Sequence, residues 1–157
     1  MPSTAEILAQ PLTLPNGQVV KNRLLKSAMS ETLAPPDNRA TEKMATLYGR
    51  WADGGIGLSV TGNVMIDRRA LGEPGNVALE DERDLPALRA WAEAGKRRDG
   101  LIYMQLNHPG RQCPKFLNRE SVAPSAVAFS EAMRPFFATP RALEGHEIED
   151  LIQRFAT

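Results

Sequence analysis

Three polar residues in this sequence each close, or nearly close, a short run of apolar residues. They are Ser30, Thr61 and Gln105. A hydroxyl can donate and accept hydrogen bonds, and an amide offers a donor and an acceptor in one plane. If the three runs are parallel strands, the side chains meet at the carboxyl edge of one sheet, which is where barrel enzymes build their active sites. The structural alternative stays open, because polar residues occur wherever strands end.

The helices that would position these side chains can be read from the spacing of apolar residues. A helix is predicted after Thr41, the expected N-cap, because apolar residues follow at i, i+3, i+4 and i+7 from Met44. A second helix is predicted over 84–100, with Asp84 as its cap. A third begins near Ile148 and shows the same apolar spacing. It meets no glycine, asparagine or proline before the sequence stops, so we expect a truncated chain.

Strands are predicted from compact apolar runs between these helices. Buried strands are expected at 24–29, 56–60 and 101–106. Ahead of them, residues 12–20 are predicted to form a hairpin, in which Asn16-Gly17 supplies the positive φ values of a tight turn. Strand and helix therefore alternate along most of the chain, which indicates parallel strands with helices packed outside.

This alternation leaves two α/β architectures open, a doubly wound sheet and a (β/α) barrel. The glycine-rich segment 54–57 precedes a strand rather than following one, so it favours a helix end over a dinucleotide-binding turn. Residues 107–142 form a long, proline-punctuated connection without periodicity. Such a connection inside a compact domain is usually functional or held by a neighbouring element.

Composition excludes several classes of function. The chain is 42% apolar and 24% charged, as in ordinary soluble domains. Nineteen basic residues balance nineteen acidic ones, so no net field favours nucleic acid. The apolar runs are far shorter than the ~20 residues that cross a bilayer. One cysteine and two histidines make neither a disulfide nor a zinc site. We expect a cytoplasmic protein without a metal.

Several other residues are predicted to be structural. His108 has no acid or metal partner in the sequence and is predicted to support the core. Cys113 is predicted to be a buried thiol, because nothing assures the contact that a Cys–His nucleophile pair needs. Arg111 is predicted to be an ion-pair partner or a loop anchor. A solvated helix end is predicted for 96–98. Both tryptophans lie on apolar helix faces and are predicted to be core.

Four segments carry a resemblance to a known family. Residues 21–30 (KNRLLKSAMS) resemble the first-strand motif of the old yellow enzyme family of flavin oxidoreductases, and residues 105–111 (QLNHPGR) resemble its third-strand motif. Residues 121–125 (SVAPS) and 140–143 (PRAL) continue the resemblance in order. It runs from about Leu12 to the last residue. The resemblance is specific because several separate motifs occur in the same order along the chain.

The resemblance implies an eight-stranded (β/α) barrel that holds FMN non-covalently. Residues 1–157 would be the amino-terminal part of one such barrel domain, with the hairpin and about three β/α units, truncated before the fourth strand. NADH or NADPH would reduce the flavin, and a hydride would then pass from flavin N5 to an activated alkene, typically an α,β-unsaturated carbonyl. In such enzymes the cofactor carries the chemistry and the protein orients it.

The same resemblance implies which residues touch the flavin. The main chain at Ala28 and Met29 would lie against it, and Ser30 would reach its O4/N5 edge. Thr61 would lie near O4, and the Gln105 amide would pair with the pyrimidine edge, whose alternating donor and acceptors suit an amide. The family commonly has proline at the place of Ala28, and threonine or cysteine at the place of Ser30. We therefore expect a similar site with altered redox tuning.

The family's catalytic groups belong to strands that follow, so none can be assigned here. These are the substrate-anchoring pair, the tyrosine acid, the arginine beside flavin N1 and the phosphate loops. Three hypotheses remain. The chain could be a portion of an enzyme that works with a complementary carboxyl-terminal chain. It could be a non-catalytic fragment that folds with a partner and binds no flavin. It could also self-associate into a barrel from two copies, since an unpaired sheet edge invites pairing.

Overall fold

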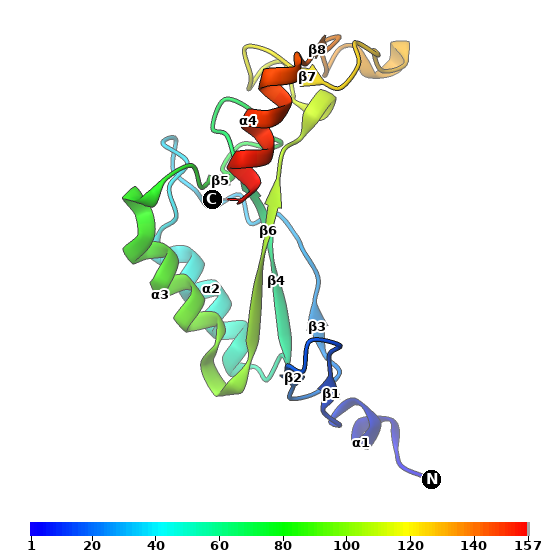
Figure 1. Cartoon of the computed structure of the whole chain (residues 1–157). Coiled ribbons are helices and arrows are strands. Elements are labelled where there is room, and N and C mark those ends of the chain that lie inside the picture. The colour runs from blue at the N-terminus through cyan, green and yellow to red at the C-terminus, as the bar shows by residue number, and fades with distance from the viewer. Residues whose placement is uncertain (157) are drawn as a thin grey trace. The chain divides into compact units, whose positions relative to one another are not determined.

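The computed structural model describes residues 1–156 of the chain, whose helices and strands are labelled in Figure 1. These residues form two compact units. The first unit comprises residues 1–29, 40–62 and 85–105. The second comprises residues 30–39, 63–84 and the chain from 106 onward. The strand β4 (Leu58–Met65) contributes residues to both units.

The first unit begins with a short helix and a hairpin. The helix α1 spans Thr4–Leu8, and the antiparallel strands β1 and β2 span Leu12–Thr13 and Val19–Val20. The hairpin was predicted, but its turn differs from the prediction. Gly17 has a φ of +84°, whereas Asn16 stays in the negative region. Leu14 N–H donates to the Gln18 carbonyl at 2.8 Å, so the turn between them holds residues 15–17 and ends in a left-handed glycine, the usual form for that length.

Four strands form the main sheet, with β4 at its centre. The strands β3 (Leu25–Lys26), β5 (Val77–Ala78) and β6 (Leu101–Asn107) each pair with β4. The pairings of β3 and β5 with β4 are parallel. Leu101 donates to the Gly57 carbonyl and Ile66 donates to the Asn107 carbonyl, so β6 runs in the same direction as β4. The predicted parallel α/β arrangement is confirmed.

The strand bounds differ from the predicted ones in ways that matter for the site. The first strand is shorter than predicted, because only Leu25 and Lys26 pair with β4. The second strand starts later and continues to Met65, so Thr61 lies inside β4 rather than after it. The third strand was predicted almost correctly, and Gln105 lies two residues before its end. The two-residue strand β5 was not predicted, because it has no alternation to reveal it.

Two helices cover one side of the first unit's strands. The helix α2 spans Glu42–Asp53 and α3 spans Leu85–Gly95, and the two lie side by side (Figure 1). Tyr48 of α2 is fully buried, with its ring 5.3 Å from Trp91 of α3 and 4.9 Å from Trp51. Trp91 is a core residue, as predicted, whereas Trp51 is only half-buried.

The ends of these helices differ in detail from two predictions. Thr41 precedes α2 in an extended conformation, but its side chain makes no capping bond. Its hydroxyl is buried and has no hydrogen-bond partner among the described residues. Residues 96–98 are exposed to solvent, as predicted, but they follow α3 instead of forming its last turn, because α3 stops at Gly95 and a 3-10 turn spans Arg97–Asp99. Arg97 and Arg98 both form ion pairs with Asp53 of α2.

The second unit is built around the end of β4 and the strand β5. Met65, Leu71 and Ala78 form its buried cluster, and Leu117 packs against them. Asn118 fixes the loop above this cluster, because its amide accepts from Leu71 N–H at 2.7 Å and donates to the Leu71 carbonyl at 2.8 Å.

The long connection 107–142 contains structure that the sequence did not predict. Its strand β7 (Val122–Ala123) pairs in parallel with β8 (Arg141–Ala142). Arg111 anchors this connection, because it donates to the Val127 carbonyl at 3.3 Å and lies 4.4 Å from the centre of the Phe129 ring. The loop-anchor interpretation of Arg111 is confirmed.

The last helix is present but presents much of its apolar face to solvent. The helix α4 spans Gly145–Ala156. Ile148, Ile152 and Phe155 are 41%, 51% and 45% exposed, although their spacing puts them on one face. No helix in the described part of the chain is both long and apolar enough to cross a membrane.

Candidate functional site

Gln105 is held in place through its main chain. Its N–H, on β6, donates to the side-chain oxygen of Thr61 on β4, at 2.9 Å. The Thr61 hydroxyl then donates to the carbonyl of Gly62 at 2.8 Å. Thr61 is 1% exposed, so both bonds are shielded from water. A hydroxyl has a single hydrogen, and at Thr61 that hydrogen is used by the main chain.

The side chain of Gln105 points away from the helices. Side chains alternate along a strand, so Gln105 shares a face of β6 with Tyr103, and Ile102 lies on the other face. Ile102 is the residue that packs on α3, because a Cβ built on Gly95 would lie 2.6 Å from its Cδ1 atom. The Tyr103 hydroxyl donates to Gln18 of the hairpin. Gln105 and Tyr103 therefore face the side without α2 and α3.

Strand β3 shows the same division between its two sides. The Lys26 ammonium lies against the rings of Tyr48 and Trp51 in α2. Its neighbour Leu25 must then point to the opposite side, and it is 57% exposed. We call the helix-free side, marked by Leu25, Tyr103 and Gln105, the open face.

The open face fits a flat ring with a polar edge. Such a ring needs apolar contact along its plane and paired donors and acceptors at its edge. Leu25 offers an exposed apolar surface, and the half-buried Gln105 offers an amide. Close by in sequence, Met29 is 57% exposed and Ala28 is half-buried. The donor set present is therefore compatible with the flavin that the resemblance implies.

Four of the five predicted site residues belong to the first unit, and Ser30 belongs to the second. Of the four, Thr61 and Gln105 are joined directly by a hydrogen bond. Ser30 is half-buried, and its hydroxyl accepts a long hydrogen bond of 3.5 Å from the Asn63 amide. This bond leaves the Ser30 hydrogen able to donate elsewhere. Sequence reasoning had no signal for Asn63.

The loop that begins at Ser30 is fixed by a tight turn of the second unit. Ala34 N–H donates to the Gly75 carbonyl at 3.0 Å. Gly75 has a φ of +76°, and a Cβ there would lie 2.6 Å from the carbonyl oxygen of Thr32. Thr32 itself has a φ of +54°. The close approach of these two backbones requires glycine at position 75.

Lys26 is the residue that the sequence reasoning missed. Its ammonium donates to the carbonyls of Ser27 at 3.1 Å and Val60 at 2.8 Å, and to the Tyr48 hydroxyl at 3.2 Å. These three bonds use all three hydrogens of the ammonium. The same Tyr48 hydroxyl accepts from Gly62 N–H at 3.2 Å. The signal available in the sequence was a lysine inside an otherwise apolar run.

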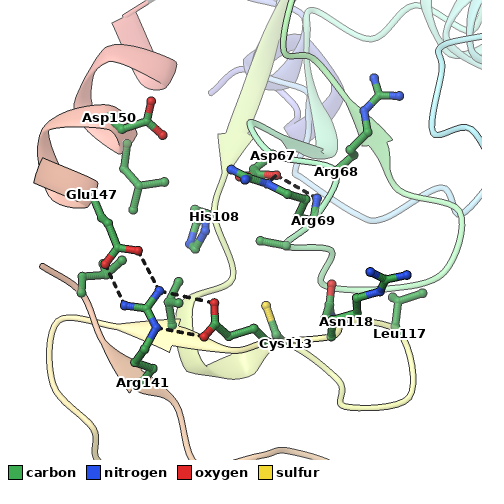
Figure 2. A pocket seen from close by; sticks show the side chains of 16 residues that line it. Asp67, Arg68, Arg69, His108, Cys113, Leu117, Asn118, Arg141, Glu147 and Asp150 are labelled. Carbon is green, nitrogen blue, oxygen red and sulfur yellow. Dashed lines mark hydrogen bonds and ion pairs between the residues drawn. The ribbon is translucent and has the colours of Figure 1, made fainter.

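A separate cavity of about 560 Å³ lies within the second unit (Figure 2). His108 and Cys113 are among its lining residues. Gly110 N–H donates to His108 Nδ1 at 3.2 Å, and burial lowers the pKa of His108, so the ring is neutral near pH 7. Burial raises the pKa of the Cys113 thiol to about 11. The predicted buried thiol is confirmed, and a protonated thiol is a poor nucleophile.

Several of the charged side chains around this cavity pair with one another. Burial works to raise the pKa of Asp67, but hydrogen bonds and charge from Arg69 outweigh it, so the pKa of Asp67 is lowered. Arg141 bridges Glu120 at 2.9 Å and Glu147 at 2.7 Å (Figure 2). These pairs fix the loops around His108 rather than presenting an unbalanced charge to a ligand.

Comparison with known proteins assigns the chain to a family. Residues 7–157 match the NADH:flavin oxidoreductase / NADH oxidase family. The chain belongs to this family. The match covers the hairpin, the open face and the second unit, so the resemblance drawn from the four motifs is confirmed.

Curated members of the family are similar over nearly the whole chain. An NADH-dependent flavin oxidoreductase of Hypocrea jecorina is 34% identical over 93% of this chain and 41% of its own length. One from Neonectria sp. is 35% identical over 94% of this chain and 21% of its own. An NADH:fumarate oxidoreductase of Klebsiella pneumoniae is 37% identical over 96% of this chain and 16% of its own length. The chain spans less than half the length of each of these relatives.

Solved structures show the same relation. An old yellow enzyme homologue from Zymomonas mobilis superposes with a TM-score of 0.81 at 27% identity, over 94% of this chain and 42% of that chain. A 2-naphthoyl-CoA reductase superposes with a TM-score of 0.83 at 25% identity, over 95% of this chain and 24% of that chain. The predicted fold class, part of a (β/α)8 barrel of the old yellow enzyme type, is confirmed.

Proposed function

We propose that this chain supplies part of the flavin site of an FMN-dependent NAD(P)H oxidoreductase of the ene-reductase type. When bound, FMN supplies hydride chemistry, taking a hydride from NADH or NADPH and passing it from N5 to an activated alkene such as an α,β-unsaturated carbonyl. Membership of the NADH:flavin oxidoreductase family supports a flavin and a nicotinamide. FMN in particular, the alkene and a cytoplasmic setting are parts of the proposal.

Different residues of the chain bind different parts of the flavin in this proposal. Gln105 pairs its amide with the pyrimidine edge of the ring, and Thr61 keeps Gln105 in register. The main chain at Ala28 and Met29 lies along the ring. Ser30 donates toward the O4/N5 edge, where reduced flavin gathers charge, so its hydroxyl favours the reduced state.

One observation carries this proposal. The Gln105 amide stands on the open face of the strands, away from α2 and α3, and the Thr61 bond fixes its backbone. In a (β/α)8 barrel this face of the strands lines the interior, and active sites are built at its carboxyl-terminal end, near which Gln105 lies. The edge of a flavin ring is the complementary partner, because it alternates donor and acceptors as an amide does.

A titration of the purified chain with FMN tests the proposal. Binding is followed by the quenching of flavin fluorescence and the shift of the visible absorption bands. Gln105→Ala should weaken binding by roughly tenfold or more, since two hydrogen bonds are lost. Gln112→Ala is the matched control, because Gln112 is exposed in a 3-10 turn of the second unit. Absence of bound flavin at saturating FMN would overturn the proposal.

A second candidate function is a non-catalytic fragment that assembles with another chain and binds no flavin. The exposed apolar residues Ile148, Ile152 and Phe155 on α4 favour it, because such a surface is usually covered. The partner would be a complementary carboxyl-terminal barrel chain or a second copy. Titration with FMN in the presence and absence of the complement, with the assembly followed by light scattering, distinguishes the two candidates. A stable assembly that still takes up no FMN would favour the fragment.

A further inference from the structure

We propose that Lys26 is a redox-tuning residue, whose buried charge stabilises the reduced form of the flavin bound on the open face. The inference rests on the proposed flavin site and goes beyond it. Lys26 lies on the opposite side of β3 from Leu25, so it acts through the sheet and not by touching the ring.

The position of this ammonium is fixed from several directions. Lys26 is 9% exposed, and its three hydrogens are donated to Ser27, Val60 and Tyr48. Its nitrogen also lies 4.7 Å from the ring centre of Trp51 and 5.0 Å from that of Tyr48. Cation–π attraction of this kind is stronger when water is excluded. The charge is therefore held in one place rather than spread by side-chain motion.

The bonds of Lys26 lead directly to the main chain proposed to contact the flavin. The Ser27 carbonyl and the Ala28 N–H are the two ends of one peptide unit, and so are the Val60 carbonyl and the Thr61 N–H. A carbonyl that accepts from a cation is polarised, and its peptide N–H becomes a stronger donor. The Tyr48 hydroxyl, which also accepts from Lys26, accepts from Gly62 N–H. The ammonium thus connects both proposed flavin-contacting stretches.

A fixed positive charge at this place acts differently on the two redox states. Reduced flavin carries more negative charge than oxidised flavin, so a nearby cation favours the reduced form. The protein interior screens this interaction much less than water does. A neutral residue at position 26 should therefore weaken the binding of reduced FMN more than that of oxidised FMN. A purely structural role would weaken both alike.

The test measures both dissociation constants in variants of the full chain. Oxidised FMN is titrated in air, and reduced FMN is titrated anaerobically after reduction with dithionite. In Lys26→Gln, which removes the charge but keeps hydrogen-bond donors, the preference for reduced over oxidised FMN should fall by roughly tenfold, the scale of one charge acting across a few residues. Lys26→Arg should restore the preference, because it keeps the charge.

The outcomes separate a failure of the proposed flavin site from a failure of the redox-tuning inference alone. If the unaltered chain binds no FMN in either state, the proposed function and this inference both fall. If FMN binds and the preference in Lys26→Gln equals that of the unaltered chain, only this inference falls. Should Lys26→Gln not fold by circular dichroism, the same comparison is made with Lys26→Met, which removes the charge but keeps an unbranched side chain of similar length. A reduced-state preference that falls there supports the inference, and an unchanged one overturns it.

Discussion

The main-chain N–H of Gln105 donates to the side-chain hydroxyl of Thr61, with nitrogen and oxygen 2.9 Å apart. In an ordinary parallel ladder a strand amide bonds to a carbonyl of the neighbouring strand. Here a side-chain oxygen of the neighbouring strand also serves as an acceptor. The bond joins two residues that the family resemblance assigns to the flavin, so Thr61 has a positional role whatever it does at the ring.

Removing this hydroxyl should destabilise the chain and weaken flavin binding. Thr61→Val keeps the shape of the side chain but removes the shielded hydrogen bond to the Gln105 N–H, which costs about 0.5–1.5 kcal/mol. Urea unfolding followed by circular dichroism measures this loss. The dissociation constant for FMN should rise in the same variant, because the Gln105 amide is no longer held in register.

Thr61→Ser is the matched control for this prediction. It keeps the hydroxyl and both of its bonds, so its FMN affinity should stay close to that of the unaltered chain. A valine variant that is as stable and binds as well as the serine variant would contradict a positional role for Thr61.

Much of the fold could be predicted because its signals are local. The apolar spacing from Met44 and from Ile148 marked two helices, and the run 101–106 marked β6 almost to the residue. Local chemistry was less reliable where tertiary packing decides. Thr41 precedes its helix as a cap should, yet its hydroxyl makes no capping bond. The two-residue strands β7 and β8 exist only because they pair with each other across the chain.

The site shows the same limit of local reasoning. Ser30, Thr61 and Gln105 were selected because polar residues close apolar runs, and family motifs supported them. Lys26 was overlooked because its role depends on Tyr48 and Val60, which are 22 and 34 residues away in the chain. A sequence pattern can place a lysine in a strand. Only the packed structure shows which carbonyls and rings surround it.

Gly75 is predicted to be intolerant of substitution. Gly75→Ala puts a methyl group 2.6 Å from the Thr32 carbonyl oxygen and requires a φ of +76° from a residue with a Cβ. We expect a loss of about 1–3 kcal/mol, as is typical of a strained backbone position. Thermal unfolding followed by circular dichroism gives the value.

Gly55→Ala separates the two causes of this loss. Gly55 also has a positive φ, of +95°, but no atom lies within 4 Å of a Cβ built there. It should therefore show the conformational cost without the steric one. Equal losses at the two positions would show that the contact with Thr32 is unimportant.

The thiol of Cys113 should make the chain less stable in strong base. Its pKa is about 11 in the folded chain, compared with an ordinary value of 9.0, because burial disfavours the thiolate. Between pH 9 and 11 the unfolded chain loses this proton while the folded chain keeps it. The free energy of unfolding therefore falls as the pH rises through that window, and the thiol contributes no pH dependence below it.

Urea unfolding at several pH values between 8 and 11 checks this thiol effect. The unaltered chain should lose stability more steeply than Cys113→Ala, which has no thiol to titrate. Labelling by a thiol reagent is a second measurement, and it is unambiguous because the chain has one cysteine. Parallel pH profiles for the two chains, or labelling of the native thiol as fast as that of the urea-unfolded one, would contradict the burial argument.

The hydroxyl of Thr41 is predicted not to stabilise the folded chain. The oxygen is buried, and no hydrogen bond to it is found among the described residues. Replacing a good N-cap by an apolar residue usually costs about 0.5–2 kcal/mol. Thr41→Val should instead leave stability unchanged or raise it, because an unpaired polar atom is removed from the interior at constant volume.

Ser3→Ala provides the contrast, since Ser3 forms both bonds of a capping box with Glu6 at the start of α1. The amide-exchange rates of Glu6 and of the first turn of α2, measured by NMR in both variants, test the difference. Faster exchange in α2 of Thr41→Val would show that Thr41 does cap the helix in solution.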